Sequence, residues 1–167
     1  MIRTKREHRA SLAYRDALLA DKERALTVPG LDSLAREAGD APSLQQELAA
    51  AYLKVGDVQG RPGFPNLGDT AGALSSYRKS LAIREALPTA WQTKTGARRD
   101  LATNCDRVGD ALRLSGDAAG ALTVYQKALT VRESLTKEAP GTLLNQRDLA
   151  DSFQRIGDTL AQMGKPT

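Results

Sequence analysis

An internal repeat restricts the possible folds of this chain more than any other feature. Residues 68–87 read GDTAGALSSYRKSLAIREAL and residues 116–135 read GDAAGALTVYQKALTVRESL, with 12 of 20 positions identical. The two copies begin 48 residues apart. Self-similarity at a fixed spacing is typical of repeat architectures, in which each unit buries its apolar face against its neighbours.

A second segment occurs three times and alternates with the first. It reads QELAAAYLKVGD at residues 46–57, RDLATNCDRVGD at 99–110 and RDLADSFQRIGD at 147–158. The unit is therefore a pair of segments, here called A and B, in the order A1, B1, A2, B2, A3. The chain stops where a third B segment would begin. The A1–A2 spacing is longer because the Pro- and Gly-rich stretch GRPGFPN, residues 60–66, lies between A1 and B1.

Both segments have the apolar periodicity of an α-helix. In A2, Leu101, Cys105, Val108 and Leu112 recur at spacings of 4, 3 and 4, which places them on one helix face. We therefore predict an all-α fold of antiparallel helix pairs, stacked as a short α-solenoid. Residues 1–42 are interpreted as a helical lead-in. Residues 43–164 hold the repeats, divided as 43–88, 89–139 and a partial unit at 140–164.

Glycines at one position of the A segments predict close packing between helices. Gly56, Gly109 and Gly157 are equivalent residues, and each falls in the middle of an expected helix. A glycine there costs about 1 kcal/mol relative to alanine. Three such glycines indicate that another helix approaches this position closely.

The expected helix ends carry their own signals. Gly116 and Asp117, like the equivalent pair in B1, predict that one helix ends at the glycine and that the aspartate caps the next. Pro88 and Pro140 mark the breaks between units. Ser43 has capping-box spacing to a glutamine three residues later and is predicted as an N-cap.

These motifs resemble the tetratricopeptide repeat (TPR), although the usual TPR unit has 34 residues. The residues that carry the resemblance are Gly109, Gly116, Asp117, Ala121, Tyr125, Ala128 and Leu129. Residues 36–87 are also similar to the C-terminal TPR region of bacterial eukaryotic-like serine/threonine protein kinases. The resemblance implies a scaffold that binds a partner's peptide segment in a concave groove lined by the A helices, in a kinase-associated setting.

The sequence does not predict an enzyme. It lacks a Gly-rich phosphate loop and the H-R-D and D-F-G triplets of a kinase. One histidine and one cysteine do not make a catalytic triad or a metal cluster. We therefore expect no catalytic residue, no metal and no cofactor. An accessory or truncated fragment of a serine/threonine kinase, without activity of its own, is the alternative.

Charged and polar residues recur on the A segments near the repeated glycine. In each copy a basic residue precedes an aspartate by three positions, which fits either a groove for a polar peptide or simple i,i+3 salt bridges. The candidate groove residues are Lys54, Asp57, Thr103, Asp106, Arg107, Asp110, Arg113, Asp151, Gln154, Arg155 and Asp158.

The third A segment has no B segment to cover its apolar side. Phe153, Ile156 and Leu160 would share that side, and solenoid ends need a cover. Burying one such side chain contributes about 1.5–3 kcal/mol. This end is therefore predicted to pack on a second copy, giving a homodimer, on another protein, or on residues of a longer parent protein.

The net charge of the chain bears on which class of partner it binds. A net charge of +4 and a pI of about 9.4 suggest nucleic acid as a partner, but acidic residues are interleaved with the basic ones. We therefore expect a protein or peptide partner, and a weak nucleic-acid binder is the second alternative.

Three single residues receive structural interpretations. The basic run around His8 is interpreted as a solvated helix end. Phe64 is interpreted as a loop residue that folds back on the repeat or anchors a partner, and Cys105 as a core residue. No apolar run is long enough to cross a membrane. We expect a cytoplasmic chain, or an extracytoplasmic one if it belongs to a membrane-bound kinase, with membrane contact only through a missing parent segment.

Overall fold

The computed structural model describes residues 31–32, 35, 39 and 41–164. It holds six helices in this part of the chain and no strand, which confirms the all-α prediction. Most of the predicted lead-in, residues 1–42, lies outside the described residues. The helices are α3 (Pro42–Gly60), α4 (Thr70–Ala86), α5 (Thr89–Gln92), α6 (Thr95–Leu114), α7 (Ala118–Glu138) and α8 (Leu143–Gln162).

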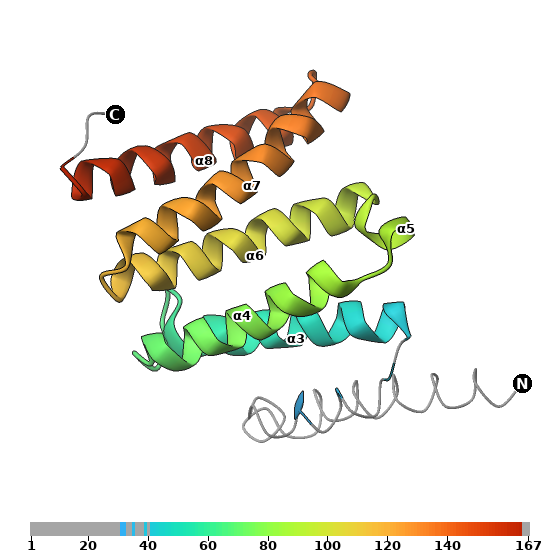
Figure 1. Ribbon diagram of the computed structural model, residues 1–167, viewed down its shortest axis with the longest axis horizontal. Coiled ribbons are helices and arrows are strands. Elements are labelled where there is room, and N and C mark those ends of the chain that lie inside the picture. The colour runs from blue at the N-terminus through green and yellow to red at the C-terminus, as the bar shows by residue number, and fades with distance from the viewer. Residues whose placement is uncertain (1–30, 33–34, 36–38, 40, 165–167) are drawn as a thin grey trace, which may run out of the picture.

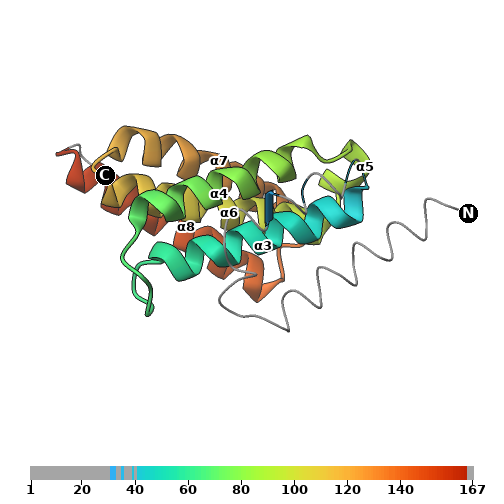
Figure 2. The same cartoon turned by 90° about the horizontal axis from the view of Figure 1, so that it is seen from below.

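The long helices stack in chain order and alternate in direction (Figure 1). Segments A1, A2 and A3 form α3, α6 and α8, and segments B1 and B2 form α4 and α7. Helix α3 packs on α4 and α6 packs on α7, while α4 also contacts α6 and α7 contacts α8. Seen from below, α4 and α7 lie along one edge of the stack, and α3 and α8 lie toward the other (Figure 2). The prediction of antiparallel helix pairs is confirmed.

A tyrosine from each B helix packs on the repeated glycine of its A helix. A Cβ atom built on Gly109 would lie 2.4 Å from Cε1 of Tyr125, and one on Gly56 would lie 2.5 Å from Cε1 of Tyr77. Both tyrosine rings are buried. The close-packing prediction is therefore confirmed at these two glycines. It is wrong at Gly157, which has no such neighbour within 4 Å, because no B helix covers α8 in the described chain.

The predicted caps of the B helices are present. The side chain of Asp117 accepts a hydrogen bond from the amide of Gly120, and Asp69 caps α4 in the same way, each at 2.8 Å. Gly116 has a φ of +87°, a left-handed conformation that suits glycine at a helix end. The prediction for Ser43 is wrong: α3 begins at Pro42 and has no side-chain cap. Proline's fixed φ already suits the first helical position.

Removing the cap of α7 gives a first test of this local structure. We expect Asp117→Ala to lower the free energy of unfolding by about 1 kcal/mol, because the Gly120 amide loses its acceptor. For a domain of this size that corresponds to a fall in Tm of about 2–4 °C, measured by thermal circular dichroism. Asp117→Asn keeps an acceptor oxygen and serves as the control. A loss of the same size in the asparagine variant would show that the cap is not the cause.

Candidate partner-binding groove

Ion pairs join each A helix to the preceding A helix. Arg107 on α6 donates from Nε to Oδ1 of Asp57 on α3 at 3.0 Å. Arg155 on α8 donates to Asp110 on α6, and its Nε lies 3.8 Å from Oδ2 of Asp106. Burial alone would lower the pKa of Arg155, but the carboxylates of Asp110 and Asp106 raise it above its usual value. The guanidinium therefore stays charged in this position.

These contacts correct the simple i,i+3 interpretation. Within one A helix, only Arg107 and Asp110 form such a pair among the described residues, and their atoms are 3.9 Å apart. The shorter bonds cross between helices. The partly buried carboxylates attract the arginine of the next unit strongly because the local dielectric is lower than in water. Lys54, at the equivalent basic position of α3, forms no ion pair within the described chain.

Asp57 and Asp110 also accept a hydrogen bond from the tyrosine of their own repeat unit. Tyr77 donates its hydroxyl to Asp57 at 2.9 Å, and Tyr125 donates to Asp110 at 2.7 Å. Burial, followed by the charge of Asp110 and the hydrogen bond to it, raises the pKa of Tyr125 well above its usual range. The hydroxyl therefore remains a donor. In Gly56–Asp57 and Gly109–Asp110, the glycine makes room for the tyrosine ring and the aspartate binds its hydroxyl as well as the arginine of the next A helix.

A buried arginine on α7 links three helices. Arg132 binds Asp106 through two nitrogens, at 2.6 Å and 3.2 Å, and donates to Oγ of Ser152 on α8 at 2.6 Å. Sequence reasoning missed this residue. Its signal was available, since Arg84 occupies the equivalent place in B1, where it is also buried and pairs with Asp100 of α6 at 3.0 Å.

The predicted groove residues therefore divide by exposure. Asp106 and Asp110 are 5% and 6% exposed, and both are bound by side chains of neighbouring helices. The half-buried members are Asp57, Thr103, Arg107, Arg113 and Arg155. The exposed members are Lys54, Asp151, Gln154 and Asp158, and their side chains have no hydrogen-bond or ion-pair partner among the described residues.

The predicted self-association end is only partly open. Phe153 is 54% exposed on α8. Ile156, in contrast, packs against the core cluster that contains Tyr125, and Leu160 is half-buried. The apolar side of α8 is thus shared between the α7 interface and an uncovered strip at Phe153.

Other residues singled out from the sequence take structural positions. Cys105 is fully buried, and burial raises the pKa of its thiol to about 11, so the prediction of a core cysteine is confirmed. Phe64 does not fold into the repeat: it is 54% exposed, with the guanidinium of Arg61 3.7 Å from its ring centre. His8 and the basic run lie outside the described residues.

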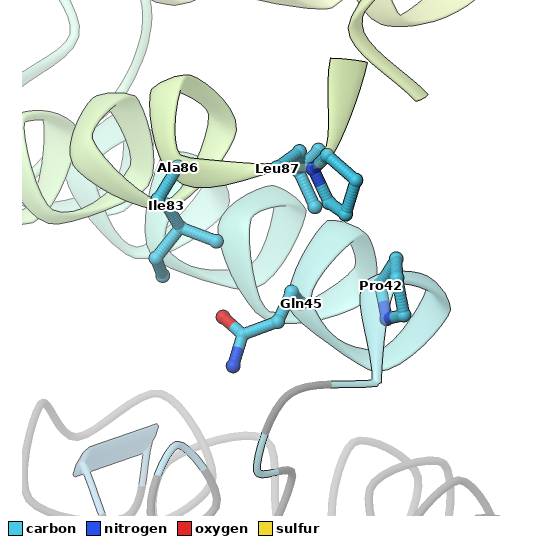
Figure 3. Close-up of a pocket in the computed structure, with 6 residues that line it drawn as sticks. Pro42, Gln45, Ile83, Ala86 and Leu87 are labelled. Carbon is cyan, nitrogen blue, oxygen red and sulfur yellow. The ribbon is translucent and has the colours of Figure 1, made fainter. Parts of the chain in front are cut away.

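A shallow pocket lies away from the candidate groove residues. It measures about 270 Å³ and opens where α3 begins and α4 ends (Figure 3). Its lining is apolar apart from Gln45, whose amide nitrogen donates to the backbone oxygen of Gly39 at 2.6 Å. Among the described residues, no charged side chain lines the pocket. Its lining residues are Pro42, Gln45, Ile83, Ala86, Leu87 and Pro88.

In the part of the chain that the structure describes, no group of three or more His, Cys, Asp or Glu residues is placed to hold a metal ion. None of the helices described there has the length and apolar character needed to cross a membrane. No protein-family model, no curated protein and no solved structure matches the chain.

Proposed function

We propose that this chain is a non-catalytic scaffold of the TPR type, which binds a peptide or protein partner along α3, α6 and α8. The alternation of A and B helices supports this proposal, and so does the glycine–tyrosine packing within each pair. The resemblance to the TPR region of bacterial kinases suggests kinase-associated signalling as the setting.

The observation that carries the proposal is the chain of ion pairs across the A helices. Arg107 and Arg155 each bind a carboxylate of the preceding A helix, so the three helices present one connected surface. The pairs neutralise the charges that lie between the helices. The charges left for a partner are the exposed ones, Lys54 on α3 and the two aspartates Asp151 and Asp158 on α8. A surface of mixed charge favours a polar peptide that carries both signs.

The arginines of the ion pairs are poor probes of binding. Reversing Arg107 would leave the half-buried Asp57 facing a second negative charge, so lost binding would not be distinguishable from lost packing. Lys54 and Asp151 are better probes, because both are exposed and neither side chain has a partner in the described chain. Arg78 on α4 has the same properties and provides a matched control on the other helix type.

The test uses a peptide selected on the intact protein from a random phage-displayed library. We expect Lys54→Glu combined with Asp151→Lys to weaken binding of that peptide about tenfold or more in fluorescence polarisation, a loss of about 1.4 kcal/mol or more. Arg78→Glu should leave the affinity unchanged. Equal affinity in the groove variant, or a loss only in the Arg78 variant, would place binding elsewhere. Retention of labelled duplex DNA at physiological salt would favour the nucleic-acid alternative.

A further inference from the structure

Helix α8 carries an uncovered copy of the face that α6 buries against α7. Gly157 and Asp158 are the equivalents of Gly109 and Asp110 on α6. On α6, the ring of Tyr125 covers the glycine and its hydroxyl binds the aspartate. On α8, a Cβ atom at Gly157 would meet nothing within 4 Å, and the side chain of Asp158 has no partner among the described residues. Phe153, Gly157 and Asp158 are called the open face of α8 below.

The two covered A helices show what an occupant of this face must contain. In α4 the buried contact residues are Ala73, Tyr77 and Ser80, and in α7 they are the equivalent Ala121, Tyr125 and Ala128. A leucine follows the last of these in both helices. The occupant is therefore a helix with alanine four residues before a tyrosine, a small residue three after it, and then leucine. The small residues allow the two helix backbones to approach.

The chain contains this pattern a third time, before the described residues. Residues 10–18 read ASLAYRDAL, beside ALSSYRKSL at 73–81 and ALTVYQKAL at 121–129. Of the four tyrosines in the chain, three occur in this pattern, and the fourth, Tyr52, belongs to α3. The match is weak outside these nine residues. The matching positions, the alanine, the tyrosine and the small residue after it, are those that are buried against an A helix in α4 and α7.

We propose that residues 10–18 of a second copy of this chain bind the open face of α8. Tyr14 of that copy packs its ring on Gly157 and donates its hydroxyl to Asp158, as Tyr125 does on α6. Asp158 lies seven residues after Asp151, on the same side of α8, so this surface adjoins the α8 end of the proposed groove. The inference is drawn from the repeated Gly-Asp positions of the A helices and does not depend on peptide binding.

Charge supports this occupant. In the described pairs, each B helix begins beside the C-terminal end of its A helix, as α7 does after α6. The basic run of Arg3, Lys5, Arg6 and Arg9 precedes residue 10, so it would lie at the C-terminal end of α8. Basic side chains are favourable there because a helix carries a partial negative charge at its C-terminus.

A second pair of positions, about two helical turns further along the same segment, is also complementary between the two copies. Where α6 has Asp106 and α7 has Arg132, α8 has Gln154, and the N-terminal segment has Asp21 seven residues after its tyrosine. An aspartate at position 154 would repel Asp21. The amide of Gln154 instead offers it a hydrogen-bond donor.

The position of the chain favours a second copy over the same molecule. Leu31 is buried against Leu48 and Tyr52 of α3, and Asp32 pairs with Lys79 of α4. Helices α3 and α8 lie at opposite ends of the stack (Figure 1). The segment before Leu31 therefore starts from the end away from α8. Binding of one copy's N-terminal segment to the α8 of the next gives a growing chain or a closed ring, and the smallest ring is a pair that exchanges the segment in both directions.

Sedimentation velocity of the full chain over a concentration series tests this proposal. We expect the mass of the wild-type particle to rise with concentration above that of a single chain. Gly157→Ala separates association from folding. The added Cβ has open space in the single chain but would occupy the place proposed for the Tyr14 ring of the second copy. Both Gly157→Ala and Tyr14→Ala should weaken association about tenfold or more. The Gly157 variant should keep its helix content, measured by circular dichroism.

Mixing the two variants supplies the decisive control. The Tyr14→Ala chain keeps an intact α8, and the Gly157→Ala chain keeps an intact N-terminal segment. We expect an equimolar mixture to form one-to-one pairs and to stop there. The proposal is overturned if wild type stays a single chain at all concentrations, which includes binding within one molecule. It is also overturned if association survives Tyr14→Ala, or if the mixture does not pair.

Discussion

Replacing Arg132 with alanine is expected to lower the free energy of unfolding by about 3 kcal/mol, because the buried carboxylate of Asp106 loses the guanidinium that binds both of its oxygens and keeps only Arg155, whose Nε lies 3.8 Å away. The exposed fractions of the two side chains are 8% and 7%, so water cannot replace the guanidinium at low cost. The same substitution removes the donor to Ser152 and with it a polar contact between α7 and α8. Urea unfolding followed by circular dichroism measures the change.

A double variant separates the lost charge from the lost packing. Asp106→Leu combined with Arg132→Met removes both charges and keeps apolar volume at the site. Exchanging a buried ion pair for apolar side chains is often neutral or stabilising. We therefore expect the double variant to be more stable than Arg132→Ala alone. A double variant that is no more stable than Arg132→Ala would contradict the explanation by a buried carboxylate that has lost its main partner.

Alanine at two equivalent glycines is expected to have opposite effects. Gly109→Ala places a Cβ atom 2.4, 2.7 and 2.8 Å from three atoms of the Tyr125 ring. That ring is buried and bound to Asp110, so it cannot move aside freely. Overpacking of this kind costs about 1–3 kcal/mol, which exceeds the gain in helix propensity. Gly157→Ala meets no atom within 4 Å and should gain up to about 1 kcal/mol.

Thermal unfolding of the two variants compares these effects directly. A change of 1 kcal/mol corresponds to about 2–4 °C in Tm for a chain of this size. Both measurements are made in a Tyr14→Ala background, so that association between chains does not contribute. We expect Tm to fall for Gly109→Ala and to stay equal or rise for Gly157→Ala. A fall of similar size in both would show that the tyrosine contact does not explain the repeated glycine.

The sequence by itself determined the helices and their pairing, because these depend on local signals. The periodicity of Leu101, Cys105, Val108 and Leu112 is a property of one helix. The caps at Asp69 and Asp117 act within one turn. The repeat then placed corresponding helices in corresponding environments. The exception was Ser43, where the proline before it already started the helix.

Only the tertiary structure decided which charged groups meet. The sequence pairs Arg107 with the nearby Asp110, but the arginine binds Asp57, which lies fifty residues earlier, at the shorter distance. Which carboxylate the arginine binds depends on which carboxylate the neighbouring helices partly bury. Asp57 is partly buried and accepts a hydrogen bond from Tyr77 of α4. For the same reason, the sequence alone does not show which of the repeated glycines is in contact with a tyrosine ring. One position is filled on α6 and open on α8, because the neighbour that fills it comes from another helix.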